Sequence, residues 1–456
     1  MILPDPKLLE KHDKNGPRYT SYPSANNFKE INDYINHFKN LHTYRSSHSQ
    51  LPVNLYIHIP FCEHVCFYCA CNKIITRDKS LSSIYLEYLK KEFLLYIQNI
   101  QRDIKISQIH LGGGTPTFFS DEQIKILINF IKQNSNLKDI EEMSIEIDPR
   151  TIDESRLKNL KKMGFTRVSF GVQDFDKNVQ QAVNRVQSYE SITEIINLTK
   201  SLGFVSTNID LIYGLPKQNI ESFKDTIEKV IKIRPDRIAL YSYAHLPDRF
   251  KPQTQISKYQ LPEAKDKVEM LFLAIKELTG QGYKYIGMDH FALETDSLAK
   301  AKQQRRLHRN FQGYSHYPDH DLIPLGVSSI GQIGGYYFQN KKDIQSYYDQ
   351  IDRNQLPHHK AYSMNYDDII RRAVIMEIMC QGYVDYETFE SSFMVNFKEY
   401  FQSELEELSA YNDERIVDID SEGIALSDVG WFFARQVAMV FDKYLPHNTN
   451  LFSKTI

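Results

Sequence analysis

Short apolar runs alternate with longer segments of helical periodicity through the first half of the chain. The apolar runs predict strands at Val53–Ile59, Ser107–Leu111, Met143–Ile147, Arg167–Gly171, Ser206–Ile212 and Arg237–Tyr243. Apolar residues at helical spacing predict helices over Leu81–Ile100, Asp121–Gln133, Asp153–Met163, Ser188–Leu202 and Ile220–Ile233. Suitable helix caps flank several of them, namely Ser120, Asp153 and Ser188 at the starts and Gly164 and Gly203 at the ends.

Strand–helix units in series predict parallel strands joined by right-handed crossovers. Polar, glycine-rich turns follow all of the predicted strands, whereas an open doubly wound sheet would gather them at one switch point. We therefore expect an α/β fold, a partial (β/α)6 barrel with helices on one face, built from residues 46–365 together with an extension.

The two flanks break this rhythm. Residues 1–45 hold the polar-aromatic run Arg18–Pro23 and an amphipathic run at Ile31–Leu41, and we expect them to close over the site. Residues 366–456 predict a mainly helical, winged-helix-like cover domain with a hairpin from Ile416–Ile419 to Gly423–Leu426 and a helix over Trp431–Tyr444. No Lys/Arg stripe marks this domain, which argues against DNA binding.

Composition narrows the class of protein. The chain has 456 residues, 41% hydrophobic and 25% charged, with a formal net charge of -3, as in globular proteins without a basic field for nucleic acid. The amino terminus does not resemble a signal peptide, and no apolar run is long enough to span a membrane. Four of the five cysteines cluster, as expected in a reducing compartment. We expect a cytoplasmic monomer.

Cysteines at 62, 66 and 69 form a C-x3-C-x2-C motif just after the first predicted strand. Three thiolates on one tight loop can hold three irons of a four-iron cluster and leave the fourth iron open to a small molecule. A zinc site would need a fourth ligand, from Cys71 or His64, without the usual second ligand pair. A disulfide suits secreted chains, and buried structural cysteine is the remaining alternative.

Polar groups follow each later strand of the predicted barrel, where ligands gather in parallel α/β folds. They are Gly112–Pro116; Glu146 and Asp148; Gln173 and Asp174, followed by Asn184 and Arg185; Asn208, Asp210 and Tyr213; and Tyr241, Tyr243 and His245. A solvated loop explains any one of them, but their recurrence at successive strand ends predicts one shared site.

With these motifs in place, the chain resembles the radical S-adenosylmethionine (SAM) superfamily and, within it, the family of oxygen-independent coproporphyrinogen III oxidases. The resemblance covers nearly the whole chain and is carried by Arg18–Pro23, Tyr56–Cys62, Cys69–Ile74, Gly112–Pro116, Glu146–Arg150, Gly171–Phe175, Asn208–Lys217, Gly287–Ala292 and His308–Tyr314. It implies conversion of two propionates of coproporphyrinogen III to vinyls in haem biosynthesis, driven by a 5′-deoxyadenosyl radical from SAM.

The resemblance also implies residue roles. Cys62, Cys66 and Cys69 would ligate a [4Fe–4S] cluster, with one SAM on the open iron and a second SAM nearby. The implied SAM contacts are Tyr56, Gly113, Gly114, Thr115, Glu146, Gln173, Arg185, Asp210, Ala244 and Ile330. Cys71 matches a family cysteine outside the ligand set. The tetracarboxylate substrate predicts cationic or donor contacts, with Arg18, Arg150, Arg249, His290, His308 and Arg309 as candidates.

The chain departs from the family pattern at two places. Ala70 replaces a frequent glycine, and Ser315 and His316 replace two threonines. A reducing donor such as flavodoxin or ferredoxin is implied as a partner. One alternative keeps the fold but makes the protein a haem chaperone; such relatives lack the extra cysteine and the Arg18–Pro23 run, both present here.

Overall fold

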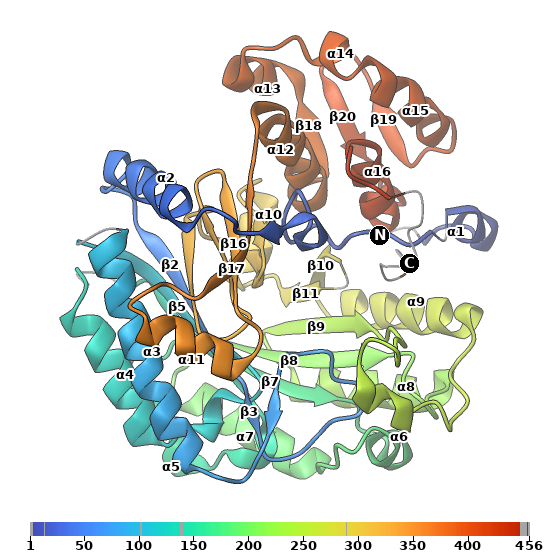
Figure 1. Ribbon diagram of the computed structural model, residues 1–456. Helices are drawn as coiled ribbons and strands as arrows, with labels where there is room; N and C mark the ends of the chain where they lie inside the picture. The colour runs from blue at the N-terminus through green and yellow to red at the C-terminus, as the bar shows by residue number, and fades with distance from the viewer. Residues whose placement is uncertain are drawn as a thin grey trace.

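The computed structural model describes residues 3–12, 14–100, 103–136, 140–288, 290–446 and 454. Within them one 13-stranded sheet dominates, in the order β1-β17-β16-β15-β14-β2-β5-β6-β7-β8-β9-β11-β10 (Figure 1). Its strands are β1 (Lys29–Glu30), β2 (Val53–Ile59), β5 (Ile106–Gly113), β6 (Glu142–Ile147), β7 (Arg167–Gln173), β8 (Ser206–Tyr213), β9 (Arg237–Ser242), β10 (Tyr283–Gly287), β11 (His290–Leu293), β14 (Asp321–Leu325), β15 (Ile330–Ile333), β16 (Tyr336–Asn340) and β17 (His358–Ser363).

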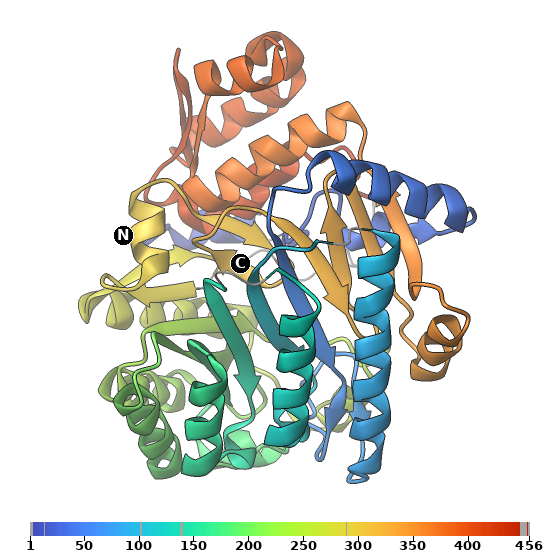
Figure 2. The same ribbon diagram turned by 90° about the vertical axis from the view of Figure 1, so that its left-hand side faces the viewer.

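The centre of this sheet confirms the predicted parallel barrel. The strands β2, β5, β6, β7, β8 and β9 lie side by side, each parallel to its neighbour. Helices cover their outer face (Figure 2): α3 (Ser80–Asn99), α4 (Asp121–Gln133), α5 (Glu154–Met163), α6 (Lys177–Ala182), α7 (Tyr189–Ser201) and α8 (Ile220–Ile233). Ser120, Asp153 and Ser188 cap α4, α5 and α7 as predicted.

Antiparallel strands extend both edges of the barrel, and the sequence did not predict them individually. On one edge β11 pairs with β9, and β10 with β11. On the other edge β14 runs parallel to β2, followed by β15, β16, β17 and finally β1 from the amino-terminal segment. A separate hairpin, β12 (His308–Asn310) and β13 (Gly313–Ser315), lies between these two extensions in the chain.

The carboxy-terminal unit is helical with a small sheet. It contains α12 (Tyr366–Gln381), β18 (Tyr383–Asp385), α13 (Tyr386–Phe393), α14 (Phe397–Tyr400), α15 (Gln402–Asp413), β19 (Val417–Ile419), β20 (Gly423–Leu426) and α16 (Ala434–Val440). The predicted hairpin is confirmed, and β18 adds an unpredicted third strand to it. The predicted last helix was too long: residues Gly430–Phe433 form a tighter 3-10 turn, and Asp442 accepts the Tyr444 N–H (2.9 Å) in a turn that ends the helix.

This unit contacts both extended edges of the sheet. Phe432 stacks on Tyr285 of β10, and the Arg372 side chain donates to the Tyr337 hydroxyl of β16 (2.9 Å). The unit therefore bridges strands that lie at opposite ends of the sheet order. None of the helices among the described residues is long and apolar enough to cross a bilayer.

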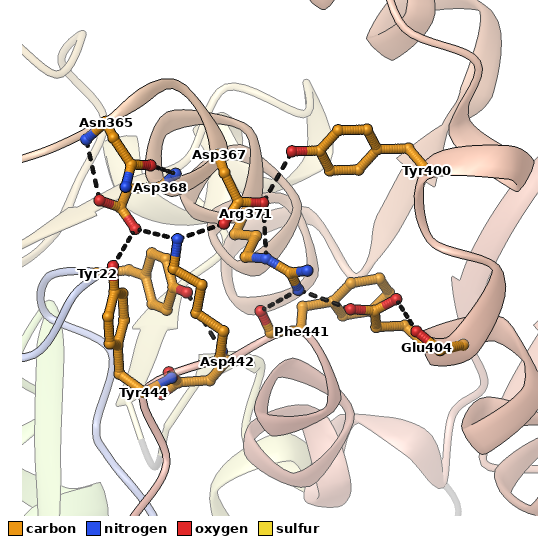
Figure 3. A network of polar contacts seen from close by, with 12 residues as sticks. Tyr22, Asn365, Asp367, Asp368, Arg371, Tyr400, Glu404, Phe441, Asp442 and Tyr444 are labelled. Atoms are coloured by element: carbon orange, nitrogen blue, oxygen red, sulfur yellow. Dashed lines mark hydrogen bonds and ion pairs between the residues drawn. The ribbon is translucent and has the colours of Figure 1, made fainter.

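A polar network joins the carboxy-terminal unit to the amino-terminal segment (Figure 3). The buried Asp368 carboxylate accepts hydrogen bonds from the hydroxyls of Tyr444 (2.7 Å) and Tyr362 (3.1 Å) and pairs with Lys443 (2.9 Å). The backbone N–H of Lys443 donates to the hydroxyl of Tyr22 (3.4 Å). The end of the chain thus holds the segment that precedes the barrel.

Candidate functional site

The cysteine loop is pinned to the barrel by its own short strands. β3 (Phe61–Cys62) pairs in parallel with β4 (Ile74–Ile75), which brings the two ends of the loop together. Cys62, Cys66 and Cys69 then line one cavity of about 160 Å³ at the carboxyl ends of the barrel strands. The structure therefore brings together the three cysteines that the sequence predicted.

The glycine loop after β5 approaches the cysteine loop so closely that a side chain would not fit. A Cβ at Gly114 would lie 2.7 Å from the Pro60 backbone and 3.0 Å from the Cys62 sulfur. The Gly114 N–H donates to the Ile59 carbonyl (2.8 Å), and the Thr115 hydroxyl lies 3.3 Å from the Cys62 sulfur. Backbone and hydroxyl groups thus face the space beside the cysteines, as the glycine run predicted.

Guanidinium groups point at one of the three sulfurs. The Cys66 sulfur accepts from Arg185 (3.4 Å) and lies 3.8 Å from an Arg150 nitrogen. These two contacts fix the position of the Cys66 sulfur at the cavity. Cys71 hydrogen-bonds to Cys69 and contributes to a lowered pKa of about 6 for the Cys69 thiol, against the opposing effect of burial. The donor set is soft sulfur on one loop, which fits an iron–sulfur cluster.

The described residues contain no group of three His, Cys, Asp or Glu side chains placed to hold a single metal ion. A mononuclear zinc site needs its ligands to converge on one point, whereas a cubane takes each thiolate on a separate iron. The three cysteines line a shared cavity, which is the arrangement a cluster requires.

Besides Lys73 near the cysteine loop, four charged residues that follow the barrel strands line the same cavity, and we call these four the rim: Glu146, Asp148, Arg185 and Asp210. Asp148 pairs with Arg150 (2.7 Å) and Arg185 (3.3 Å), which hold its pKa below the ordinary value although burial acts to raise it. Burial likewise acts to raise the pKa of Glu146, but the bond from His110 and the Gly113 N–H (3.1 Å) hold it lower.

Asp210 behaves differently from the other two rim carboxylates. It accepts hydrogen bonds from Asn208 (2.7 Å) and Ser169 (3.4 Å), but no cation pairs with it among the described residues. Burial first, and then the charge of Glu146, raise its pKa to about 7. The rim therefore offers ionised carboxylates together with one that gains a proton near neutral pH, suited to ammonium and hydroxyl groups of a ligand.

Most of the predicted SAM contacts meet at this cavity. Gly113, Gly114, Thr115, Glu146, Gln173, Arg185 and Asp210 line it together with the cysteines. Tyr56 stacks on His110 and hydrogen-bonds to His58 (3.1 Å), close to Glu146. Ala244, in the loop after β9, and Ile330, at the start of β15, are not among its described lining residues.

A second cavity, of about 190 Å³, continues into the barrel and shares Glu146, Ser169 and Asp210 with the first. Barrel interiors are usually filled by apolar side chains. Here alternate inward positions are polar, as in Ser144 and Glu146 of β6 and in Asn208 and Asp210 of β8. The barrel thus encloses a polar shaft that leads away from the cysteines.

At the amino ends of the strands the shaft is closed by a group we call the floor: Glu142, Arg167, Ser206 and Arg237. Four residues of strand separate floor from rim, about 13 Å. Arg167 pairs with Glu142, Arg237 pairs with Asp296 (2.9 Å), and both guanidiniums donate to the Ser297 hydroxyl. The sequence analysis missed the floor, although the alternation of polar residues along each strand was a usable signal.

The candidate substrate contacts are not all in one place. Arg18 stands over the Tyr241 ring, Arg309 stands over the Tyr314 ring, and His290 lies between these two rings. Arg150 is paired with Asp148 at the rim, Arg249 lies against Phe250, and the charged neighbours of half-buried His308 are Asp319 and Arg372. Ser315 and His316, the departures from the family pattern, line the shaft.

Comparisons with known proteins match this arrangement. The family model of the radical SAM superfamily matches residues 56–230, and that of the HemN C-terminal domain matches residues 365–433. An oxygen-independent coproporphyrinogen III oxidase from Pseudomonas aeruginosa is 43% identical over 456 residues, 99% of this chain and 98% of that protein. Its counterpart from Escherichia coli is 40% identical over 454 residues, 99% and 98% of the two chains.

A solved structure agrees over the same length. The structure of coproporphyrinogen III oxidase (HemN) from Escherichia coli, described as a radical SAM enzyme, superposes with a TM-score of 0.91 at 40% identity, covering 97% of this chain and 99% of that one. The barrel, its extensions and the carboxy-terminal unit thus all superpose on one solved structure.

Proposed function

Because the chain belongs to the family of oxygen-independent coproporphyrinogen III oxidases, which are radical SAM enzymes, we propose that Cys62, Cys66 and Cys69 hold its [4Fe–4S] cluster and that the rim holds SAM. The chain is an oxidoreductase of haem biosynthesis that converts two propionates of coproporphyrinogen III to vinyls without oxygen. The observation that carries the site assignment is the meeting of the three cysteines, the glycine loop and the rim around one cavity.

The bound cluster and SAM would supply a 5′-deoxyadenosyl radical, which takes a hydrogen atom from a propionate so that carbon dioxide and one electron are lost and a vinyl remains. The protein's own groups bind and orient. Glu146 and Asp210 suit the ammonium and ribose hydroxyls of SAM, and Arg185 with Arg150 would hold the Cys66 sulfur in position at the cavity. The remaining proposed SAM contacts are Tyr56, Gly113, Gly114, Thr115, Gln173, Ala244 and Ile330.

A second SAM is part of the proposal. The shaft meets the rim cavity at Glu146, Ser169 and Asp210, and this end of the shaft provides adjacent polar space for another ligand. Equilibrium dialysis of the cluster-loaded protein with labelled SAM measures the stoichiometry. Two SAM per cluster are expected, and a value of one overturns this part of the proposal.

Three further assignments accompany the site. We propose the division into residues 1–45, 46–365 and 366–456, of which 1–2, 13, 101–102, 137–139, 289, 447–453 and 455–456 lie outside the described residues. We propose a flavodoxin or ferredoxin as electron donor and a cytoplasmic monomer as the working form. Gel filtration and turnover with each purified donor test these assignments.

The direct test is an anaerobic assay of the reconstituted protein with coproporphyrinogen III, SAM and a reductant. Formation of protoporphyrinogen IX together with 5′-deoxyadenosine is expected. The alternative function is a haem chaperone that keeps the fold without oxidase activity, and it predicts tight haem binding with no decarboxylation. The presence of Cys71 beside Cys69 and the docking of the Tyr22 segment favour the oxidase.

A further inference from the structure

Buried guanidinium groups in this protein fall into two kinds. Those of the floor are neutralised, since Arg167 and Arg237 pair with Glu142 and Asp296. Arg309 is only 5% exposed, yet its Nε and Nη1 groups have no hydrogen-bond partner, and no carboxylate pairs with it among the described residues. A buried cation without an anion is costly, so Arg309 points to an anion that the described residues do not provide.

A second guanidinium, that of half-buried Arg18, stands nearby and has no ion pair within the described part of the chain. Arg18 lies over the Tyr241 ring (5.6 Å), Arg309 lies over the Tyr314 ring (4.5 Å), and the His290 ring contacts both tyrosines. The two tyrosines and His290 line the shaft. Burial, and then the charges of Arg309 and Arg18, lower the pKa of His290 to about 3, so the histidine adds no positive charge of its own. The two arginines and three rings form a group we call the clamp.

The field along the shaft is therefore polarised. Carboxylates of the rim line the end of the shaft next to the cysteine cavity, whereas Arg18 and Arg309 stand over two tyrosines, Tyr241 and Tyr314, that also line the shaft. A ligand that carries several carboxylates is repelled by Glu146 and attracted by Arg18 and Arg309. Arginine also binds carboxylates in a two-pronged geometry that fixes their orientation.

The carboxy-terminal unit holds both arginines in place. Next to Arg18, the Tyr19 hydroxyl donates to Asp442 (3.0 Å) and the Pro17 carbonyl accepts from Arg435 (3.1 Å). Tyr314, the cross-strand partner of Arg309, donates through its hydroxyl to the Met379 carbonyl (3.0 Å) of α12. Residues of the unit thus fix the chain on both sides of Arg18 and anchor the hairpin that carries Arg309.

We propose that Arg18 and Arg309 bind the propionate carboxylates that the substrate keeps, and that the carboxy-terminal unit positions this clamp. The proposal rests on the proposed function, because it takes a tetracarboxylate tetrapyrrole as the occupant. With those carboxylates at the clamp, the propionates that react face the rim.

Arg309→Gln, Arg309→Lys and Arg18→Gln variants of the cluster-loaded enzyme test the clamp. Arg309→Gln is expected to raise KM for coproporphyrinogen III about 10- to 100-fold, the size of a lost charge-assisted hydrogen bond, with a smaller rise for Arg309→Lys and Arg18→Gln. Cluster content is expected to stay at the wild-type level. Arg305→Gln is the matched control, because exposed Arg305 stands over Tyr383 at the same 4.5 Å but outside the shaft.

A second readout separates recognition from folding. Fluorescence titration compares coproporphyrin III, which has four carboxylates, with mesoporphyrin IX, which has two. Loss of the clamp is expected to erase most of the preference for the tetracarboxylate, whereas a merely structural defect weakens both ligands alike. Should Arg309→Gln fail to fold, Arg309→Lys and Arg18→Gln carry the same comparison.

Tyr19→Phe, which removes only the bond to Asp442, tests the positioning role. The variant is expected to raise KM for coproporphyrinogen III several-fold, which corresponds to the loss of about one hydrogen bond. Its kcat is expected to stay within a factor of two. The clamp proposal fails if the wild type is active but none of the arginine variants changes KM or the ligand preference. The proposed function would stand in that case. A wild type that forms no product from coproporphyrinogen III overturns the proposed function instead.

Discussion

The floor and the rim of the barrel contain the same kinds of side chain, but these groups pair with one another to different extents. At the floor, Arg237 and Asp296 pair with each other, and the latter also accepts from Ser206 and from the Leu298 N–H. At the rim Asp148 pairs with Arg185, but no cation among the described residues pairs with Asp210, and the cysteine thiols face a cavity. Ionic groups that satisfy one another stabilise the barrel, whereas groups left unsatisfied at the strand ends are available to a ligand.

The largest effect is expected at the rim cavity. Cys66→Ala removes one of three thiolates on the cysteine loop and should abolish bound iron and lower turnover at least about 100-fold, because losing even an outer partner of a metal ligand can cost that much. Iron analysis and product formation measure it. Cys380→Ala is the matched control, since Cys380 is buried away from this cavity. Full cluster content in Cys66→Ala would contradict the assignment.

The second largest effect is expected at the floor, on the stability of the protein. Arg237→Met leaves Asp296 with a weaker ion pair, to Arg167 at 3.7 Å, and should lower the free energy of unfolding by about 3 kcal/mol. Urea unfolding measures the loss. Turnover per folded molecule, measured alongside, tests whether Arg237, which lines the shaft, also contacts a ligand there. A large fall in turnover without loss of stability would show that the floor is not merely structural.

Asp210→Asn should stabilise the protein at the rim, in a pH-dependent way. The pKa of Asp210 rises from an ordinary 3.8 to about 7 in the folded state, first by burial and then by Glu146. The unfolded chain therefore releases this proton earlier as pH rises, so the native carboxyl loses stability between about pH 4 and pH 7.

The variant should consequently be more stable to urea than wild type above about pH 7 and match it below about pH 4. The expected gain is about 2 kcal/mol, about half of what the full pKa shift carries, because solvent in the cavity screens the partly exposed carboxyl. SAM binding should weaken at the same time. A gain that is the same at all pH values would show that the effect is packing and not ionisation.

The smallest effect is expected at the floor. Ser297→Ala removes the acceptor shared by Arg167 (2.8 Å) and Arg237 (3.0 Å), and about 1 kcal/mol of stability should be lost. Differential scanning calorimetry measures the fall in Tm, with Ser191→Ala on the outer helix α7 as a surface comparison. A loss equal to that of Arg237→Met would show that the serine, and not the ion pairs, organises the floor.

The barrel strands and the cysteine loop were predictable because their signals are local. Strand β2 and helices α4 and α8 have the predicted bounds, since apolar periodicity and caps act within a few residues. The cysteines, the glycine run and the strand-end carboxylates follow from spacing and from the rule that parallel strands end on one edge. The family resemblance added the individual SAM contacts, and seven of them line one cavity.

The added strands of the sheet, the floor and the clamp were not predicted, because they depend on contacts between segments far apart in the sequence. Strand β14 pairs with β2, and the two-residue strand β1 pairs with β17. The periodicity of the sequence predicts neither pairing. The pairing of Arg237 with Asp296 joins β9 to the segment before α10 (Ser297–Gln303). The sequence shows that Arg309 is charged, but it does not show whether a carboxylate pairs with it. Only the three-dimensional structure shows that its Nε and Nη1 groups have no hydrogen-bond partner among the described residues.

The bond from Tyr19 to Asp442 joins residues 423 positions apart. During synthesis, the cysteine loop and its strands leave the ribosome long before the residue that seats Tyr19 exists. The amino-terminal segment therefore docks only after the barrel strands and the cysteine loop have been made. Contacts between residues so far apart in the sequence form slowly, so docking of the amino-terminal segment is expected to be a late step of folding.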